Sequence, residues 1–315
     1  MRGPHEGTGT AWTVSSARGG AGAPVSEVGR IASVSMEPLS ARLGYPEDAV
    51  LLIVNCDDLG FCHAANLGVF EALRTGLATS ASLMVPCPWA RGAAAAYRGE
   101  DVGVHLTLNA EFDLYRWGPI THAPSLLDGD GGFPRTAADV WEHADLDEVR
   151  RECRAQIERA ILWGFDVSHL DAHLGTLQAR PEFFDVYLEL AVEFVLPLRL
   201  SGPTTEAHVG FPFRSLALEE GVVFPDDTIP LPGPGARKTL LAAIGSLTPG
   251  VHVVSLHPAV ASAELEAMAP DWAARVDDHR LLTRDRELQA ALDDAGVTLI
   301  GYRPLRDLMR AERAR

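Results

Sequence analysis

The sequence lacks a long apolar segment, contains few cysteines and has no cluster of basic residues. No stretch approaches the roughly 18 consecutive apolar residues that suit a membrane-spanning helix, so no membrane span is expected. The N-terminus does not show the basic-then-apolar order of a signal peptide. Acidic residues number 43 against 27 basic ones, and this balance argues against a nucleic-acid partner. A cytoplasmic location is the expectation.

The cysteines provide no sign of a disulfide framework or of a cysteine-rich metal site. The chain has four of them, and none belongs to a C-x-x-C pair: Cys56, Cys62, Cys87 and Cys153. So few cysteines in a chain of this length predict reduced, buried thiols.

The first 46 residues differ in composition from the rest of the chain. They are rich in glycine, serine, alanine and proline and show no sustained hydrophobic periodicity. We predict a disordered N-terminal extension over residues 1–46 and a single catalytic domain over 47–315. Because Met36 stands just before the patterned region, a translation start there is an open alternative.

From residue 49 onward, strand-like and helix-like segments alternate, which predicts an α/β fold with parallel strands. The expected strands lie at 49–54, 80–85, 102–108, 167–170, 196–200, 251–256 and 297–300. The expected helices include 64–75, 146–163, 181–193, 237–244 and 281–293, with a charged helix at the end. Both a barrel and an open doubly wound sheet fit this order. The absence of G-x-G-x-x-G after the first strand favours the barrel.

Aspartates and histidines lie within or just after the ends of several expected strands: Asp57, Asp58, His105, His169, Asp171, His173 and His257. The carboxyl ends of parallel strands share one edge, where active sites collect. Adjacent carboxylates repel each other unless a cation or hydrogen bonds hold them, although a turn or helix-cap aspartate is the structural alternative.

Each histidine has an alternative explanation of its own. His105 lies inside an apolar strand and could be a core residue. In the H-x-D-x-H run, alternate side chains share a face, so His169, Asp171 and His173 would point one way if the strand continued that far. His257 precedes Pro258 and is either a general acid or a rigid loop residue.

Two imidazoles and one carboxylate leave open positions on a divalent ion for water and substrate. Imidazole nitrogen favours zinc or another transition metal, whereas magnesium prefers oxygen ligands. A metal-dependent hydrolase is therefore one function that these residues predict.

These segments, taken together and in order, resemble the YdjC/ChbG-like carbohydrate deacetylases. The matching segments are NCDDLG at 55–60, TSASLMV at 79–85, GVHLTL at 103–108, HLDAH at 169–173 and LHP at 256–258. The resemblance covers about residues 49–310. It implies a distorted (β/α) barrel of about seven parallel strands, NodB-like or TIM-like, and one divalent metal ion, magnesium or zinc.

Carried over residue by residue, the resemblance implies that Asp58, His105 and His173 bind the metal ion. Asp57 would be the general base and His257 the general acid. Arg199 resembles a family arginine near the site, where it would orient Asp57 or bind substrate; a surface or core-pairing arginine is the alternative.

The chain departs from the family pattern at three positions. Leu174 follows His173 where the family continues to a second histidine, Cys56 replaces a small residue, and Ala259 replaces the glycine after His-Pro. These three changes leave the expected metal ligands unaffected and bear on the choice of substrate.

The resulting hypothesis is a hydrolase that removes acetate from an N-acetylated sugar of the N-acetylglucosamine type, as mono- or oligosaccharide or glycoconjugate. The partner is a small-molecule sugar, and the oligomeric state is left open, with a homodimer as one option. The alternatives are another single-metal barrel enzyme, such as a sugar isomerase or phosphoester hydrolase, and a non-catalytic sugar-binding protein on the same fold. A long loop at 109–139 is expected to be functional.

Overall fold

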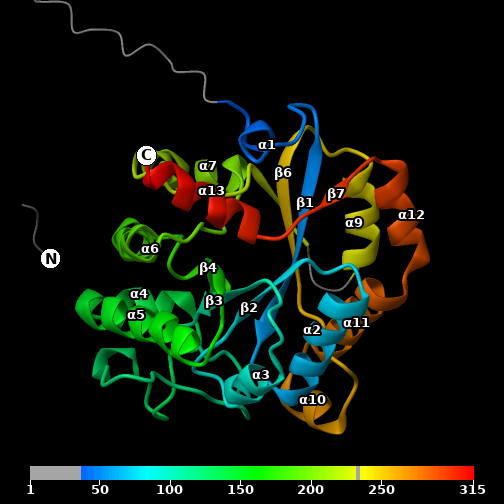
Figure 1. Cartoon of the computed structure of the whole chain (residues 1–315). Coiled ribbons are helices and arrows are strands. Elements are labelled where there is room, and N and C mark those ends of the chain that lie inside the picture. The colour runs from blue at the N-terminus through cyan, green and yellow to red at the C-terminus, as the bar shows by residue number, and fades with distance from the viewer. Residues whose placement is uncertain (1–36, 232–234) are drawn as a thin grey trace, which may run out of the picture. The chain divides into compact units, whose positions relative to one another are not determined.

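A sheet of seven parallel strands forms the centre of the computed structural model, which describes residues 37–231 and 235–315 (Figure 1). The strands run in the spatial order β4-β3-β2-β1-β6-β5, and β7 pairs with the first half of β1. Their bounds are β1 Val50–Leu59, β2 Ser80–Leu83, β3 Val102–Leu106, β4 Val167–Ala172, β5 Asp227–Ile229, β6 Gly250–Leu256 and β7 Thr298–Leu299. The predicted α/β fold with parallel strands is confirmed.

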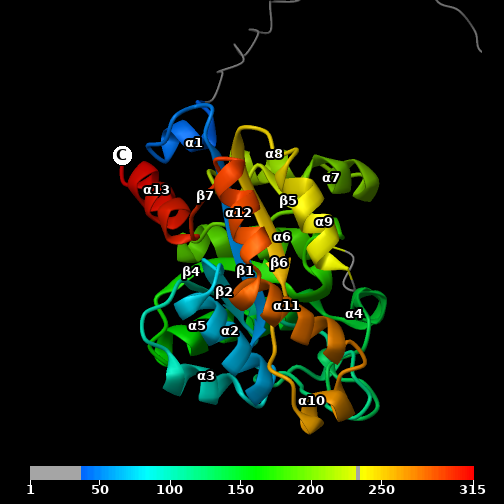
Figure 2. The same ribbon diagram turned by 90° about the vertical axis from the view of Figure 1, so that its right-hand side faces the viewer.

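Helices cover the outside of the sheet. In Figure 1, α4, α5 and α6 lie on one side of β1, and α2, α9, α11 and α12 lie on the other. Figure 2 shows α11 and α12 in front of β1 and β6. The α-helices are α1 Leu39–Arg42, α2 His63–Thr75, α3 Ala90–Ala96, α4 Ala137–His143, α5 Leu146–Leu162, α6 Pro181–Phe194, α7 Pro203–Val209, α8 Phe213–Glu219, α9 Ala236–Ile244, α10 Ala263–Met268, α11 Trp272–Arg284, α12 Arg286–Asp294 and α13 Arg303–Arg313. Two 3-10 turns are η1 Pro124–Leu126 and η2 His173–Gly175. No helix among the described residues is both long enough and apolar enough to cross a membrane.

The central strands are buried on both faces, as expected for a parallel sheet covered by helices. Leu51, Leu52 and Ile53 of β1 are at most 1% exposed, and Val253 and Val254 of the neighbouring β6 are fully buried. This burial explains why the sequence of these strands is a continuous apolar run rather than an alternating one.

The predicted strand at 196–200 is wrong as a regular strand. Leu198 makes a single parallel bridge with Leu170 of β4, and its N–H donates to the carbonyl of Val223. Pro197 has no N–H to donate to a ladder, which limits pairing here. The segment lies between β4 and the approach to β5 and leaves the sheet a distorted, incompletely bonded barrel.

The predicted helix at 281–293 is also wrong as one element. The chain divides there into the end of α11 and α12, and Asp285 separates them. Its side chain accepts hydrogen bonds from the N–H groups of Glu287 and Leu288 and so caps α12.

The predicted N-terminal extension covers both described and undescribed residues. Residues 1–36 lie outside the described part of the chain, but 37–46 contain α1, where Leu39 is buried and Arg42 pairs with Glu312. The predicted boundary at residue 46 is therefore too late, because apolar burial and this ion pair order the segment before it.

Gly68 of α2 allows this helix to pack against the loop that follows β6. A Cβ atom at Gly68 would stand 2.7 Å from the carbonyl oxygen of Pro258 and 2.8 Å from Cα of Ala259. Since both neighbours are backbone atoms, only glycine permits this approach, and the loop that it supports carries His257.

Replacing Gly68 with alanine is expected to destabilise the fold by about 1–3 kcal/mol, because the added methyl group must displace backbone. The matched control is Gly245→Ala, where the nearest atom to a new Cβ is 3.9 Å away. Urea unfolding of both variants measures the difference. Equal stability of Gly68→Ala and the wild type would contradict the packing described.

Candidate metal centre

The end of β1 directs two consecutive carboxylates toward the same edge of the sheet. Neighbouring strand residues normally point to opposite faces. Here the pairing with β2 changes register between Cys56 and Leu59, and Asp58 has a left-handed φ of 64°. This irregularity breaks the alternation, and both Asp57 and Asp58 line one cavity. Left-handed backbone at a non-glycine residue is costly and is typical of functional sites.

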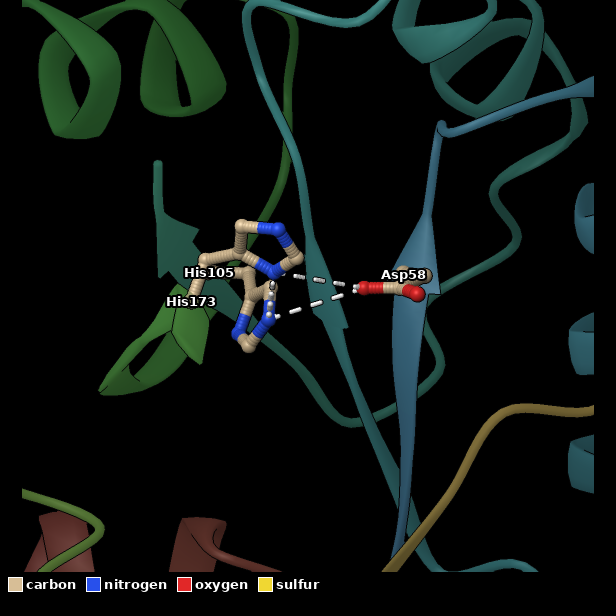
Figure 3. Close-up of side chains that lie close together, drawn as sticks. All are labelled: Asp58, His105 and His173. Carbon is tan, nitrogen blue, oxygen red and sulfur yellow. Dashed lines mark hydrogen bonds and ion pairs between the residues drawn. The ribbon is translucent and has the colours of Figure 1, made fainter. Parts of the chain in front are cut away.

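Asp58 meets two histidines from other parts of the barrel (Figure 3). His105 comes from β3, and His173 begins η2 directly after β4. Oδ1 of Asp58 lies 3.6 Å from Nε2 of His105 and 3.7 Å from Nδ1 of His173. The two imidazole nitrogens are 3.1 Å apart. All three side chains are buried.

The outer nitrogen of each histidine faces a carboxylate. Nδ1 of His105 is hydrogen-bonded to Asp171, and Nε2 of His173 lies 3.0 Å from Oε2 of Glu111. A carboxylate can only accept a hydrogen bond, so in the neutral rings these outer nitrogens carry the protons. The inner nitrogens, which face Asp58, then present lone pairs.

Three acceptors without protons therefore converge at one buried point. Oδ1 of Asp58 has no hydrogen-bond partner among the described residues. Such a set repels itself unless a cation lies among the three atoms. Four tetrahedral ligands about 2.1 Å from an ion lie roughly 3.4 Å from one another, which matches the observed separations. The donor set thus fits a divalent metal ion.

When no cation lies among these three atoms, the neighbouring carboxylates favour a proton on His105. Burial alone would lower the pKa of His105, but Asp171, Asp57 and Asp58 reverse the effect and raise it. A metal ion that binds here therefore has to displace a proton, so its affinity should increase with pH.

Arg275 of α11 engages the other oxygen of Asp58. Its Nη1 donates to Oδ2 at 2.7 Å, and its Nε donates to Asp271 at 2.9 Å. Burial would raise the pKa of Asp58, but Arg275 and the surrounding histidines hold that pKa far below its usual range. Asp58 is thus ionised, with one oxygen committed to Arg275 and the other directed at the histidines.

Arg199 holds Asp57 in a similar way. Its Nη1 donates to both carboxylate oxygens, at 2.8 and 2.9 Å, and also contacts Ser255. Its Nη2 lies 3.3 Å from Asp171. Asn55 donates to Oδ1 of Asp57 at 2.7 Å. The orientation of Asp57 is therefore set by several bonds.

Asp57, His105 and Asp171 form a second group whose atoms are close enough to hold a metal ion. Oδ2 of Asp171 has no hydrogen-bond partner among the described residues, but the charges of this group are already balanced. Arg199 places its positive charge between the two carboxylates, and the nitrogen that His105 turns toward Asp171 carries a proton.

The remaining predicted residue, His257, lies at the mouth of the site. Its side chain is 42% exposed, and its Nε2 is 3.9 Å from Oδ2 of Asp57. The backbone N–H of His257 donates to Asp278 of α11. His257, Asp57 and the three converging side chains all line one cavity of about 750 Å³.

His169 does not join this group. The expectation that His169, Asp171 and His173 share a face required the strand to continue as far as His173. Because β4 ends at Ala172, His173 lies outside the strand and the condition is not met. His169 is fully buried, stacks on Tyr302 with ring centroids 3.7 Å apart, and would collide with any Cβ at Gly103. It is a core residue of the barrel.

Two residues of the site could not be anticipated from the pattern. Glu111 lies in the long loop after β3, and Arg275 lies in α11, far along the chain. Neither stands in a segment with a distinctive motif. The loop itself behaves as expected in one respect, since residues 111–114 line the cavity.

The fold and the site define a class of protein: a parallel α/β barrel with a buried carboxylate–imidazole centre at the carboxyl ends of its strands. Comparison with known proteins gives the family. Residues 51–298 match the family model described as YdjC-like protein. The chain belongs to this family, and the predicted resemblance is confirmed.

Two curated relatives bear the same functional name. A carbohydrate deacetylase of Thermus thermophilus is 38% identical over 254 residues, which cover 78% of this chain and 90% of the relative. A carbohydrate deacetylase of Geobacillus stearothermophilus is 32% identical over 256 residues, covering 80% and 96%.

A solved structure shares the fold. A crystal structure from Enterococcus faecalis V583, of a protein provisionally assigned to cellobiose-phosphate cleavage, superimposes with a TM-score of 0.72 at 27% identity. The match covers 82% of this chain and 99% of that protein. The predicted barrel architecture is confirmed by this likeness.

The buried His169 makes stability depend on pH. Burial lowers its pKa from 6.5 to about 3. Between these values the unfolded chain binds a proton that the folded chain excludes, so stability is lost as the pH falls below about 6.5. From pH 7 to pH 5, the wild type should lose about 2 kcal/mol more than His169→Gln does. Urea unfolding at both pH values measures this, and equal losses would contradict a neutral buried histidine.

Proposed function

We propose that this protein is a metal-dependent carbohydrate deacetylase that hydrolyses the acetamide of an N-acetylated sugar of the N-acetylglucosamine type and releases acetate. The observation that carries the proposal is the convergence of three unprotonated acceptors on the wall of a cavity that also contains Asp57 and His257. The name shared by the two curated relatives reported above supports the same class of enzyme.

Asp58, His105 and His173 would hold the ion. A divalent ion bound there would lower the pKa of water and polarise an amide carbonyl, which are two of the requirements of amide hydrolysis. Two imidazoles with a single carboxylate favour zinc or another transition metal over magnesium on grounds of ligand softness. Asp57, the neighbour of Asp58, is not needed as a metal ligand in this arrangement.

Asp57 is suited to take the proton of the attacking water. It lies next to the three candidate metal ligands, but its carboxylate is held by Arg199 and Asn55 and not by the two histidines among those ligands. Its bonds fix the carboxylate without covering the cavity side, since Asp57 still lines the cavity. Arg199 thereby acts as a positioning residue for Asp57.

His257 is suited to protonate the leaving nitrogen. It lines the same cavity as the three candidate ligands, lies close to Asp57, and its partial exposure gives it contact with solvent, from which it can take a proton. Acetate and a free amino sugar would then leave. Asp278 holds the backbone of His257 and keeps the loop in place.

Two alternatives receive less support from this geometry. A phosphoester hydrolase typically uses two metal ions, and the second group of ligands is occupied by Arg199. A non-catalytic sugar-binding protein does not require a base and an acid, here Asp57 and His257, beside the three candidate metal ligands.

Removing any one of the three ligands should remove the ion. We expect Asp58→Ala, His105→Ala and His173→Ala to be purified with most of the metal lost, because two ligands rarely suffice. Elemental analysis of the purified proteins measures this. His252→Ala is the matched control: His252 is buried in β6 and binds the carbonyl of Thr248, away from the cavity. Full metal content in any of the three ligand variants would refute its assignment.

Asp57→Asn should separate catalysis from metal binding. We expect kcat for acetate release from N-acetylglucosamine oligomers to fall by about 100-fold or more, while the metal content stays near that of the wild type. Asp277→Asn, at an exposed position of α11, serves as the control for the same chemical change. Normal turnover in Asp57→Asn would show that this carboxylate is not the base, and activity that survives a chelator would refute metal dependence.

A further inference from the structure

The cavity that holds the candidate metal centre is lined by far more negative than positive groups. Within residues 37–231 and 235–315, two guanidinium groups line it, those of Arg199 and Arg275. Six carboxylates line it as well: Asp57, Asp58, Glu111, Asp113, Glu266 and Asp271. With a divalent ion among the three ligands and with His257 protonated as the proposed general acid, the six carboxylates still exceed the five positive charges by one.

Both guanidinium groups are already committed. Arg199 is bonded to Asp57 and Asp171, and Arg275 is bonded to Asp58 and Asp271. Their side chains are only 15% and 5% exposed. To bind an anionic substrate group, either arginine would have to leave a buried carboxylate without its partner, which is strongly unfavourable.

Of the carboxylates nearer the mouth, Asp113 is paired with Arg135 at 2.7 Å, whereas Glu266 has no such partner in the described part of the chain. Glu266, on α10, is exposed, and its side chain makes no hydrogen bond or ion pair with another described residue. Glu111 is 26% exposed and has His173 as its partner. An approaching anion therefore meets repulsion at the entrance and finds no uncommitted arginine or lysine among the described residues that line the cavity.

The rest of the lining suits a neutral sugar. Apolar surface comes from Phe112, Leu114, Leu174, Met268 and Pro270, of which Leu114 and Leu174 are 81% and 53% exposed. Apolar groups of this kind can pack against the carbon–hydrogen faces of a sugar ring, and they offer nothing to a charged substituent.

We propose that this cavity selects N-acetylated sugars that are neutral, or that already bear a free amine, and rejects sugars that carry a phosphate. The inference rests on the proposed deacetylase function and narrows its substrate class. It also predicts that this chain prefers a substrate unlike the phosphorylated disaccharide to which the Enterococcus faecalis protein is provisionally assigned. The ammonium group of the amino-sugar product is compatible with the same negative lining.

The test compares a disaccharide of N-acetylglucosamine with the same disaccharide phosphorylated at a 6-hydroxyl. With the metal-loaded enzyme at low ionic strength, kcat/KM for acetate release should be at least about tenfold lower for the phosphorylated sugar. The difference in kcat/KM between the two disaccharides should decrease at higher salt concentration, because salt screens the repulsion. Equal or higher kcat/KM for the phosphorylated sugar would overturn the inference.

A charge-removing variant locates the cause of the selectivity. Glu266→Gln should raise the ratio of kcat/KM for the phosphorylated over the neutral sugar by a few-fold, because one uncompensated charge is lost at the mouth. The matched control is Glu264→Gln on the same helix, since Glu264 does not line the cavity. A ratio that does not move in Glu266→Gln, or that moves equally in both variants, would contradict the assignment to the cavity lining.

Binding distinguishes this inference from the proposed function. Calorimetric titration with glucosamine and with glucosamine 6-phosphate measures the charge preference without any turnover. If neither disaccharide releases acetate but the phosphorylated monosaccharide binds more weakly, the deacetylase proposal fails and the charge preference stands. Tighter binding of the phosphorylated monosaccharide overturns the charge preference.

Discussion

The repulsion among three unprotonated acceptors at the ends of β1, β3 and β4 is the constraint on which the site depends. Asp58, His105 and His173 would not converge in a buried place without compensation. The surrounding groups are arranged to maintain the convergence: Asp171 and Glu111 fix which nitrogens carry protons, and Arg275 occupies the second oxygen of Asp58. A divalent cation resolves the repulsion better than any arrangement of protons.

The same arrangement separates the roles of the two adjacent carboxylates. The left-handed backbone at Asp58 lets both side chains reach the cavity, and two different arginines then hold them apart. Arg275 comes from α11, which also holds the backbone of His257 through Asp278. One helix outside the barrel thus supports both the candidate metal ligand and the candidate acid, which links the folding of the outer layer to the geometry of the site.

Much of this could be predicted from the sequence, for a definite physical reason. Buried parallel strands read as apolar runs, and polar residues at their carboxyl ends gather at one edge, so a convergence of aspartate and histidine side chains was predictable. The choice of Asp58, His105 and His173 among them was implied by the family resemblance. Arg275 and Glu111 were not predictable, because their positions depend on how a helix and a long loop fold back across the barrel. The strand predicted at 196–200 and the single helix predicted at 281–293 failed at Pro197 and Asp285. A single residue that prevents strand pairing or caps a helix is a weak signal beside hydrophobic periodicity.

The most direct test of the account is a crystal structure of the protein grown with zinc or manganese, with the ion located by its anomalous scattering. The account predicts one ion bonded to Oδ1 of Asp58, Nε2 of His105 and Nδ1 of His173, with Asp57 unbound and still paired with Arg199. An ion held by Asp57, His105 and Asp171, or no ordered ion in this cavity, would contradict it.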